Sequence, residues 1–194
     1  MSGKDSLAIV EGTLIDGTGK DPVGNSAVLV QNGRISNVGP MKTVKIPSGA
    51  EVISASGFTV MPGIIDAHVH FMGIRVALGS VVAGQVSPYV EIIRAANDAK
   101  KVLAAGVTSI ADAGSPHAVE LKKAVIEKEI PGPRFFVSGH ALTQTGGHGD
   151  PRALPLEWAR GGRIGGVLYT RVCDGVDEVR RVLREQIRNG ADFV

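Results

Sequence analysis

The chain has 194 residues, of which 43% are apolar, and this is enough to bury a hydrophobic core. Its 21 basic and 19 acidic residues give a formal net charge of +2, so the composition does not favour a nucleic-acid partner. The sequence has no run of about 18 apolar residues and no apolar leader at its start. We therefore expect no membrane association and a cytoplasmic location.

The first 60 residues consist of short β-type runs that are separated by turn signals. Asn32-Gly33 lies between two such runs, residues 27–31 and 34–38, and this dipeptide is a strong signal for a β-hairpin. The pattern predicts a small β unit over residues 1–60.

His68 and His70 follow at the end of an apolar run that contains Ile64 and Ile65. Residues two apart on a strand point to the same side, so both imidazoles can reach one metal ion. Burying two imidazoles is costly unless something bonds them, and neutral histidine is the commonest ligand of zinc-like ions. From this pattern alone, the alternative of two polar side chains bonded to backbone or water stays open.

After residue 61 the pattern alternates between strand and helix. Apolar spacing predicts helices over residues 88–105, from Ser115-Pro116 onward, and around Val179, Leu183 and Ile187, the last ending at Gly190. Short apolar runs at residues 106–111, 134–138 and 191–194 suit parallel strands. These β/α repeats predict either a barrel or an open α/β sheet.

His148 lies in a glycine-rich loop that follows the third of these units. In β/α barrels the loops after the strands build the active site, and glycine lets backbone approach a ligand closely. If the repeats form a barrel, His148 is therefore expected at its active-site face. The alternative is a surface histidine in a flexible turn.

Four other polar or reactive side chains carry weaker interpretations. Asp66 either orients a ligand histidine as a hydrogen-bond acceptor or caps a turn. We expect His117 to be solvated in the first turn of a helix and His140 to be structural. The lone Cys173 cannot form an internal disulfide and is expected to be a buried thiol.

The run Pro62-Gly-Ile-Ile-Asp-Ala-His-Val-His70 resembles the first-strand signature of the amidohydrolase superfamily of metal-dependent hydrolases. Residues 106–114 resemble its second barrel strand. Thr145-Gly-Gly-His-Gly-Asp150 resembles the branch that holds imidazolonepropionase-related and prolidase-like dipeptidases. The resemblance implies an α/β fold: residues 1–60 would be part of a small β-sandwich domain, and residues 61–194 the first half of a (β/α)8 TIM-like barrel, both incomplete in this chain.

The resemblance also implies roles for individual residues. His68 and His70 would bind divalent metal, expected to be one or two zinc ions, with Asp66 as their hydrogen-bonded support. His148 would polarise the substrate carbonyl. A carboxylated bridging lysine, two later histidines and a general-base aspartate would lie beyond Val194, so we expect the 194-residue chain alone to be inactive.

The function that follows is metal-dependent hydrolysis of the amide bond of dipeptides or N-acyl amino acids through metal-activated water. Three alternatives stay open: an imidazolonepropionase-like hydrolase of a cyclic amide, a non-catalytic scaffold of the same fold, and a metal-binding α/β module unrelated to hydrolysis. The expected partner is a small-molecule or dipeptide substrate. The full-length protein is compatible with a homo-oligomeric state.

Overall fold

The computed structural model describes residues 6–73, 87–161 and 170–194. The chain divides into two compact units, Met1–Pro62 and Gly63–Val194. No helix in these described ranges combines the length and the apolarity needed to cross a membrane.

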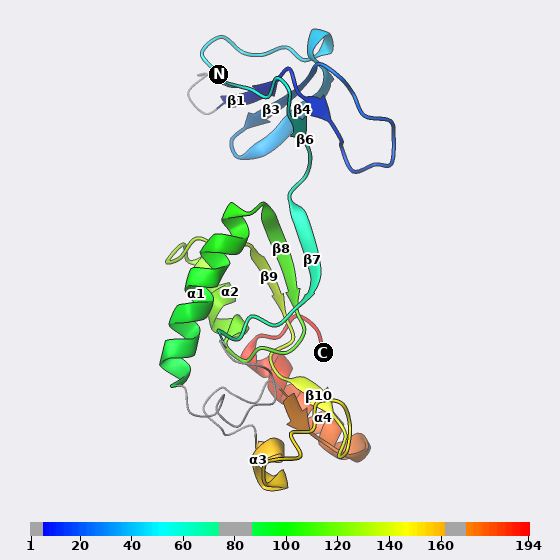
Figure 1. Cartoon of the computed structure of the whole chain (residues 1–194), viewed down its shortest axis with the longest axis vertical. Coiled ribbons are helices and arrows are strands. Elements are labelled where there is room, and N and C mark those ends of the chain that lie inside the picture. Colours follow the sequence, from blue (N-terminus) through cyan, green and yellow to red (C-terminus); the bar gives the residue numbers. More distant parts are fainter. Residues whose placement is uncertain (1–5, 74–86, 162–169) are drawn as a thin grey trace. The chain divides into compact units, whose positions relative to one another are not determined.

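The first unit is built on a four-stranded sheet with the order β4-β3-β1-β5 (Figure 1). Its strands are β1 (Ser6–Val10), β3 (Ser26–Gln31), β4 (Arg34–Pro40) and β5 (Glu51–Ser54). The β1–β3 and β3–β4 pairs are antiparallel, and β1–β5 is parallel. A second, two-stranded sheet pairs β2 (Thr13–Leu14) with β6 (Thr59–Val60), and a 3-10 turn, η2, covers Met41–Thr43.

The predicted hairpin is confirmed. Asn32 and Gly33 join β3 to β4 and both have positive φ angles, 51° and 71°, as a tight two-residue turn requires. The buried side chains of this unit alternate along β1, which is the period of two that a half-buried strand produces. Five buried side chains of this unit form its core cluster: Ala8, Val10, Ala27, Leu29 and Val44.

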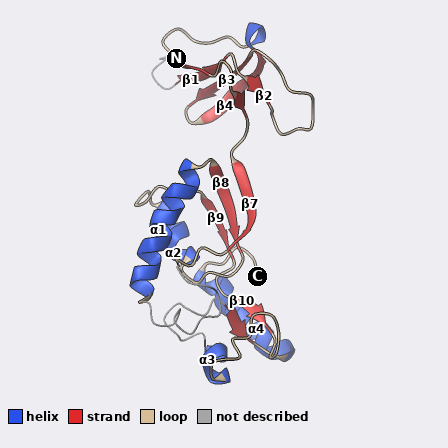
Figure 2. Ribbon diagram, in the orientation of Figure 1, coloured by secondary structure: helices blue, strands red, loops and turns tan. Residues whose placement is uncertain are grey.

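The second unit contains a parallel three-stranded sheet with the order β7-β8-β9 (Figure 2). Its strands are β7 (Ile64–Val69), β8 (Val107–Asp112) and β9 (Arg134–Val137). Helix α1 (Pro88–Ala104) lies between β7 and β8 in the chain, and α2 (Ala118–Ile126) lies between β8 and β9. These are the β/α repeats that the sequence predicted, and within the described residues the sheet stays open and forms no closed barrel.

The rest of this unit was predicted only in part. Helix α4 (Gly175–Asn189) ends at Gly190, whose φ of 103° is left-handed, as predicted. Three elements were missed: helix α3 (Leu156–Gly161) and the strands β10 (Ala141–Thr143) and β11 (Thr170–Val172), which pair in a parallel two-stranded sheet. Three-residue strands are too short to show a period.

Two predicted elements were wrong in detail. Helix α2 begins at Ala118, with His117 as its N-cap. Ser115 and Pro116 form a separate turn before it, in which the backbone carbonyl of Ser115 accepts a hydrogen bond from the backbone N–H of Ala118. Residues 191–194 do not form a strand. This segment joins β9 instead through one backbone bond, Asp192 N to Val137 O at 2.7 Å.

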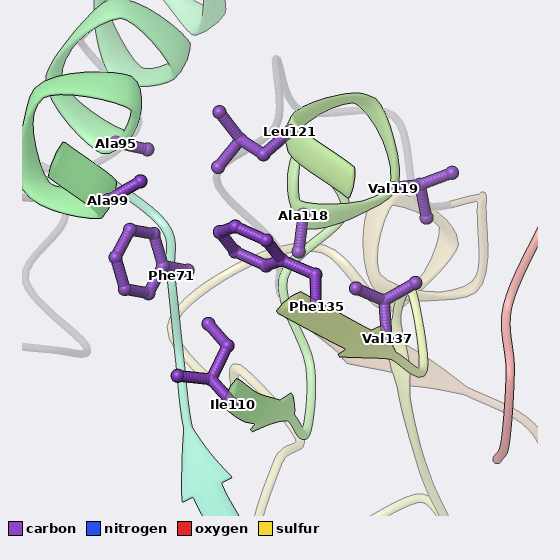
Figure 3. Close-up of a cluster of buried hydrophobic side chains, with 9 residues drawn as sticks. All are labelled: Phe71, Ala95, Ala99, Ile110, Ala118, Val119, Leu121, Phe135 and Val137. Atoms are coloured by element: carbon purple, nitrogen blue, oxygen red, sulfur yellow. The ribbon is translucent and has the colours of Figure 1, made fainter. Parts of the chain in front are cut away.

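Both helices α1 and α2 pack on one face of the β7-β8-β9 sheet. Figure 3 shows Ala95 and Ala99 of α1 facing Phe71, and Leu121 of α2 close to Phe135. The opposite face of the sheet carries side chains that are exposed to solvent, such as Phe136, which is 46% exposed. The complete cluster is Phe71, Ala95, Ala99, Ile110, Ala118, Val119, Leu121, Phe135 and Val137.

Leu121 is 2% exposed within this cluster, and we expect Leu121→Ala to lower the free energy of unfolding by about 2–5 kcal/mol. Ile126 on the same helix is 68% exposed, and Ile126→Ala should change that free energy by less than about 0.5 kcal/mol. Denaturant unfolding of both variants measures the difference. Equal losses for the two variants would contradict this core assignment.

Candidate active site

The strand that carries the two histidines is fixed at its start by a close approach to β8. A side chain at Gly63 would overlap the side chain of Thr108, so this position of the Pro-Gly sequence has room only for glycine. The amide of Ile64 then donates to the carbonyl of Gly106 at 2.9 Å, which begins the parallel pairing.

The pairing between β7 and β8 is irregular around His68. Asp66 pairs with Ile110 and Val69 pairs with Asp112, so β7 has one more residue than β8 over this interval. Such a bulge interrupts the ladder and re-aims side chains. Asp66 Oδ1 accepts from the backbone N–H of His68 at 3.2 Å, so its carboxylate supports the bulged backbone. This geometry matches the turn-capping alternative for Asp66.

His68 and His70 lie next to each other at the end of β7. Their ring centroids are 5.2 Å apart, the rings are perpendicular, and both side chains are exposed. The described residues contain no group of three or more His, Cys, Asp or Glu side chains that could hold a metal ion. The donor type and the spacing of the two rings fit two ligands of a zinc-like ion, and further ligands would have to come from other parts of the polypeptide.

Asp112 lies at the end of β8, beside this strand end. Its side chain is 0% exposed, and its carboxylate accepts from the backbone N–H groups of Phe71, at 2.6 Å, and Gly114, at 3.1 Å. Burial raises the pKa of Asp112, and these hydrogen bonds and the nearby His70 oppose that rise. The partner of this carboxylate could not be predicted from the sequence, because Phe71 lies 41 residues away and leaves no local signal.

His148 lies on the loop after β10, with its side chain exposed. The backbone of the loop is held on both sides of this histidine. Gly146 N donates to Asp150 Oδ2 at 2.7 Å, and Thr170 Oγ1 donates to Gly149 O at 2.5 Å. A histidine on a restrained loop can keep a defined position while its ring stays accessible.

The start of the same loop is tied to the N-terminus of α4. The carboxylate of Asp174 accepts three hydrogen bonds. Two come from Thr145, from its backbone N–H at 2.9 Å and from its hydroxyl at 2.5 Å, and the third comes from the guanidinium of Arg160 at 2.9 Å. The Thr145 bonds, with help from Arg160, lower the pKa of Asp174. The carboxylate is therefore ionised at neutral pH.

The expectation that His117 is solvated was wrong. Its ring Nε2 lies 3.2 Å from Oε2 of Glu91, which is 1% exposed, and burial raises the pKa of this glutamate while His117 opposes the rise. A signal for the burial of Glu91, though not for its partner, was present in the sequence. Glu91 lies four and eight residues before Ala95 and Ala99, so it belongs to the buried face of α1.

The remaining two predictions about single side chains agree with the structure. Cys173 is a buried free thiol, and burial raises its pKa. His140 has a structural setting, since its backbone N–H donates to Oε1 of Gln186 at 3.3 Å. Burial, together with the charge of Arg171, lowers the pKa of His140 to about 4.

Comparison with known proteins places this strand, its two histidines and the following β/α repeats in one family. Residues 59–194 match the sequence profile of the amidohydrolase family. The chain is also 33% identical to ochratoxinase from Aspergillus niger over 202 residues, which covers 96% of this chain and 40% of that enzyme. The chain belongs to the amidohydrolase family, in the branch that includes ochratoxinase and prolidase-like proteins.

Solved structures agree with this assignment. The crystal structure of A. niger ochratoxinase superposes with a TM-score of 0.85 at 32% identity, covering 96% of this chain and 45% of that one. A prolidase complexed with N-methylphosphonate-L-proline superposes with a TM-score of 0.81 at 35% identity, with the same two coverages. A dihydroorotase from Geobacter metallireducens is 56% identical, but over only 43 residues, or 22% of this chain. The chain thus spans less than half the length of ochratoxinase and of the prolidase, although nearly all of this chain is matched.

The pKa of His140 falls from 6.5 to about 4 on folding, so between these pH values the imidazole is neutral in the folded state and protonated in the unfolded state. Its contribution to stability is present above pH 6.5 and is lost as the pH falls toward 4. We expect the unfolding free energy of the wild type to drop by roughly 3 kcal/mol more than that of His140→Gln across this interval. Urea unfolding at a series of pH values measures both, and parallel curves would contradict the shift.

Proposed function

We propose that the complete polypeptide carrying this chain is a metal-dependent hydrolase that cleaves the amide bond of dipeptides or N-acyl amino acids. The observation that carries the proposal is the pair of adjacent imidazoles of His68 and His70 at the end of β7, in a chain of the amidohydrolase family. The substrate class is supported by the likeness along 96% of the chain to a prolidase that binds a proline phosphonate.

His68 and His70 would hold the metal, which we expect to be zinc, as one or two ions. The donor set supports this choice because neutral imidazole suits zinc, and catalytic zinc sites draw their ligands from several strands. When bound, such an ion supplies a water of lowered pKa that can act as a nucleophile at neutral pH. Within this chain, the backbone around the two histidines is supported by Asp66 and Asp112.

His148 would act on the substrate itself. Its loop is expected to lie at the same end of the β/α repeats as the metal ligands, because loops after parallel strands build that face. A ring N–H of His148 would donate to the carbonyl oxygen of the scissile amide and would bind more strongly as negative charge develops there. The flanking glycines leave the backbone free of side chains that would block a substrate.

Hydrolysis of a cyclic amide is the second candidate function, and the dihydroorotase likeness favours it. That likeness covers 22% of the chain, whereas the ochratoxinase and prolidase likenesses cover 96%. The extent of the match therefore supports linear amides. A panel of dipeptides, N-acyl amino acids and cyclic amides, assayed with the complete polypeptide, tests the choice. Turnover of cyclic amides alone would reverse it, and no turnover with zinc bound would indicate a scaffold.

Replacing both His68 and His70 by Ala in the complete polypeptide should abolish hydrolysis and sharply lower its zinc content, because both proposed ligands from β7 are removed. Elemental analysis of the purified protein measures the zinc. His148→Ala is the matched control, since it also removes an imidazole and should keep the zinc. A double variant that retains full zinc content would overturn the metal site.

His148→Ala in the complete polypeptide should lower kcat by on the order of 10²–10³, the usual effect of losing one donor to the reacting oxygen. Steady-state kinetics with the best substrate of the panel measures this. An unchanged kcat would show that His148 is a surface residue without a catalytic role. A lowered kcat together with a loss of zinc would show that His148 is a metal ligand instead.

A further inference from the structure

The buried carboxylate of Asp112 lies on β8, beside the end of β7. Asp112 pairs with Val69 in the parallel ladder, and its Oδ2 accepts from the amide of Phe71 at 2.6 Å. The pairing and this bond bracket His70, which lies between Val69 and Phe71. The carboxylate therefore fixes the backbone on the far side of a candidate metal ligand.

The chain beyond His70 is fixed a second time by packing. The ring of Phe71 meets the ring of Phe135 edge to face, with centroids 5.4 Å apart. A backbone held by both a charged hydrogen bond and a buried ring has little freedom to rotate. Since a ligand histidine inherits the position of its own backbone, these two contacts limit where the His70 ring can lie.

The bulge that contains His68 makes such a restraint necessary. A register shift between Asp66 and Val69 loosens the ladder at the point where the two imidazoles leave the strand. Asp66 supports the backbone N–H of His68 from within β7. Asp112 supports the backbone after His70 from β8, so one carboxylate lies on each side of the histidine pair.

Closing the turn after β8 does not by itself explain Asp112. The bond from Gly114 N to Oδ1 is local and could form with an exposed side chain. Taking a carboxylate out of water is costly, and Asp112 is 0% exposed in a position that reaches the other strand. The long-range hydrogen bond from the backbone N–H of Phe71 explains why this carboxylate is buried.

We propose that Asp112 is a positioning residue that sets the backbone at His70 before metal binds, and so presets the metal ligands of β7. This inference rests on the proposed metal-binding role of His68 and His70. It assigns to β8 a part in the metal site although no ligand is assigned to that strand.

Asp112→Asn in the complete polypeptide tests the proposal. Asparagine has the same shape but one acceptor, so its NH2 group must face one of the two backbone N–H donors, Phe71 or Gly114. We expect the zinc affinity, measured by competition with a chelator on metal-free protein, to fall 10–100-fold. Asp177→Asn is the matched control, because the side chain of Asp177 is 97% exposed, and its zinc affinity should be unchanged.

A measurement on the wild type decides the question if Asp112→Asn does not fold. In the metal-free protein, hydrogen–deuterium exchange at the amide of Phe71 should be as slow as at Ser138, whose N–H is bonded to the carbonyl of Asp112 at 3.0 Å. Fast exchange at Phe71 that slows only when zinc is added would show that metal, and not Asp112, orders the strand end.

The outcomes separate this inference from the function on which it rests. A wild-type polypeptide that binds no zinc overturns the proposed metal site itself. Equal zinc affinities for the wild type and Asp112→Asn overturn the positioning role and leave the metal site in place. A selective loss in Asp112→Asn, with Asp177→Asn unchanged, supports both.

Discussion

The parallel pairing of β7 with β8 is the constraint on which the candidate site depends. It requires a glycine at position 63, where a side chain would overlap Thr108, and it brings Asp112 beside the end of β7. The helices α1 and α2 bury the other side of this sheet, so the strands cannot slip without exposing the cluster around Ile110 and Phe135. The core of the second unit thus determines where the two histidines emerge.

Regular elements with a long apolar period could be predicted from the sequence. Helices α1 and α4 and the hairpin at Asn32-Gly33 are of this kind, because the information that forms them is local. The start of α2 could not be predicted. Ser115-Pro116 is a standard helix start, but Ser115 is buried at the end of β8 and the helix begins only at Ala118. Tertiary packing replaced the local preference.

The candidate site also has features that could be predicted from the sequence and features that could not. The proximity of His68 and His70 follows from their spacing on one strand, whereas the bulge at Asp66 depends on how two strands align and cannot be seen in either alone. The partner of Glu91 was hidden for a related reason. A helical period shows which face is buried, but not that His117 from another element meets it there.

Cys173 gives the second unit a natural reporter of local opening. The thiol is buried and its pKa is raised, so it reacts slowly with thiol reagents while the structure around it is closed. Its backbone N–H donates to the carbonyl of Thr143 at 2.8 Å, next to the β10–β11 pair. Because it is the single cysteine of the sequence, the rate of its modification measures how often this small sheet, and with it the anchoring of the His148 loop, comes apart.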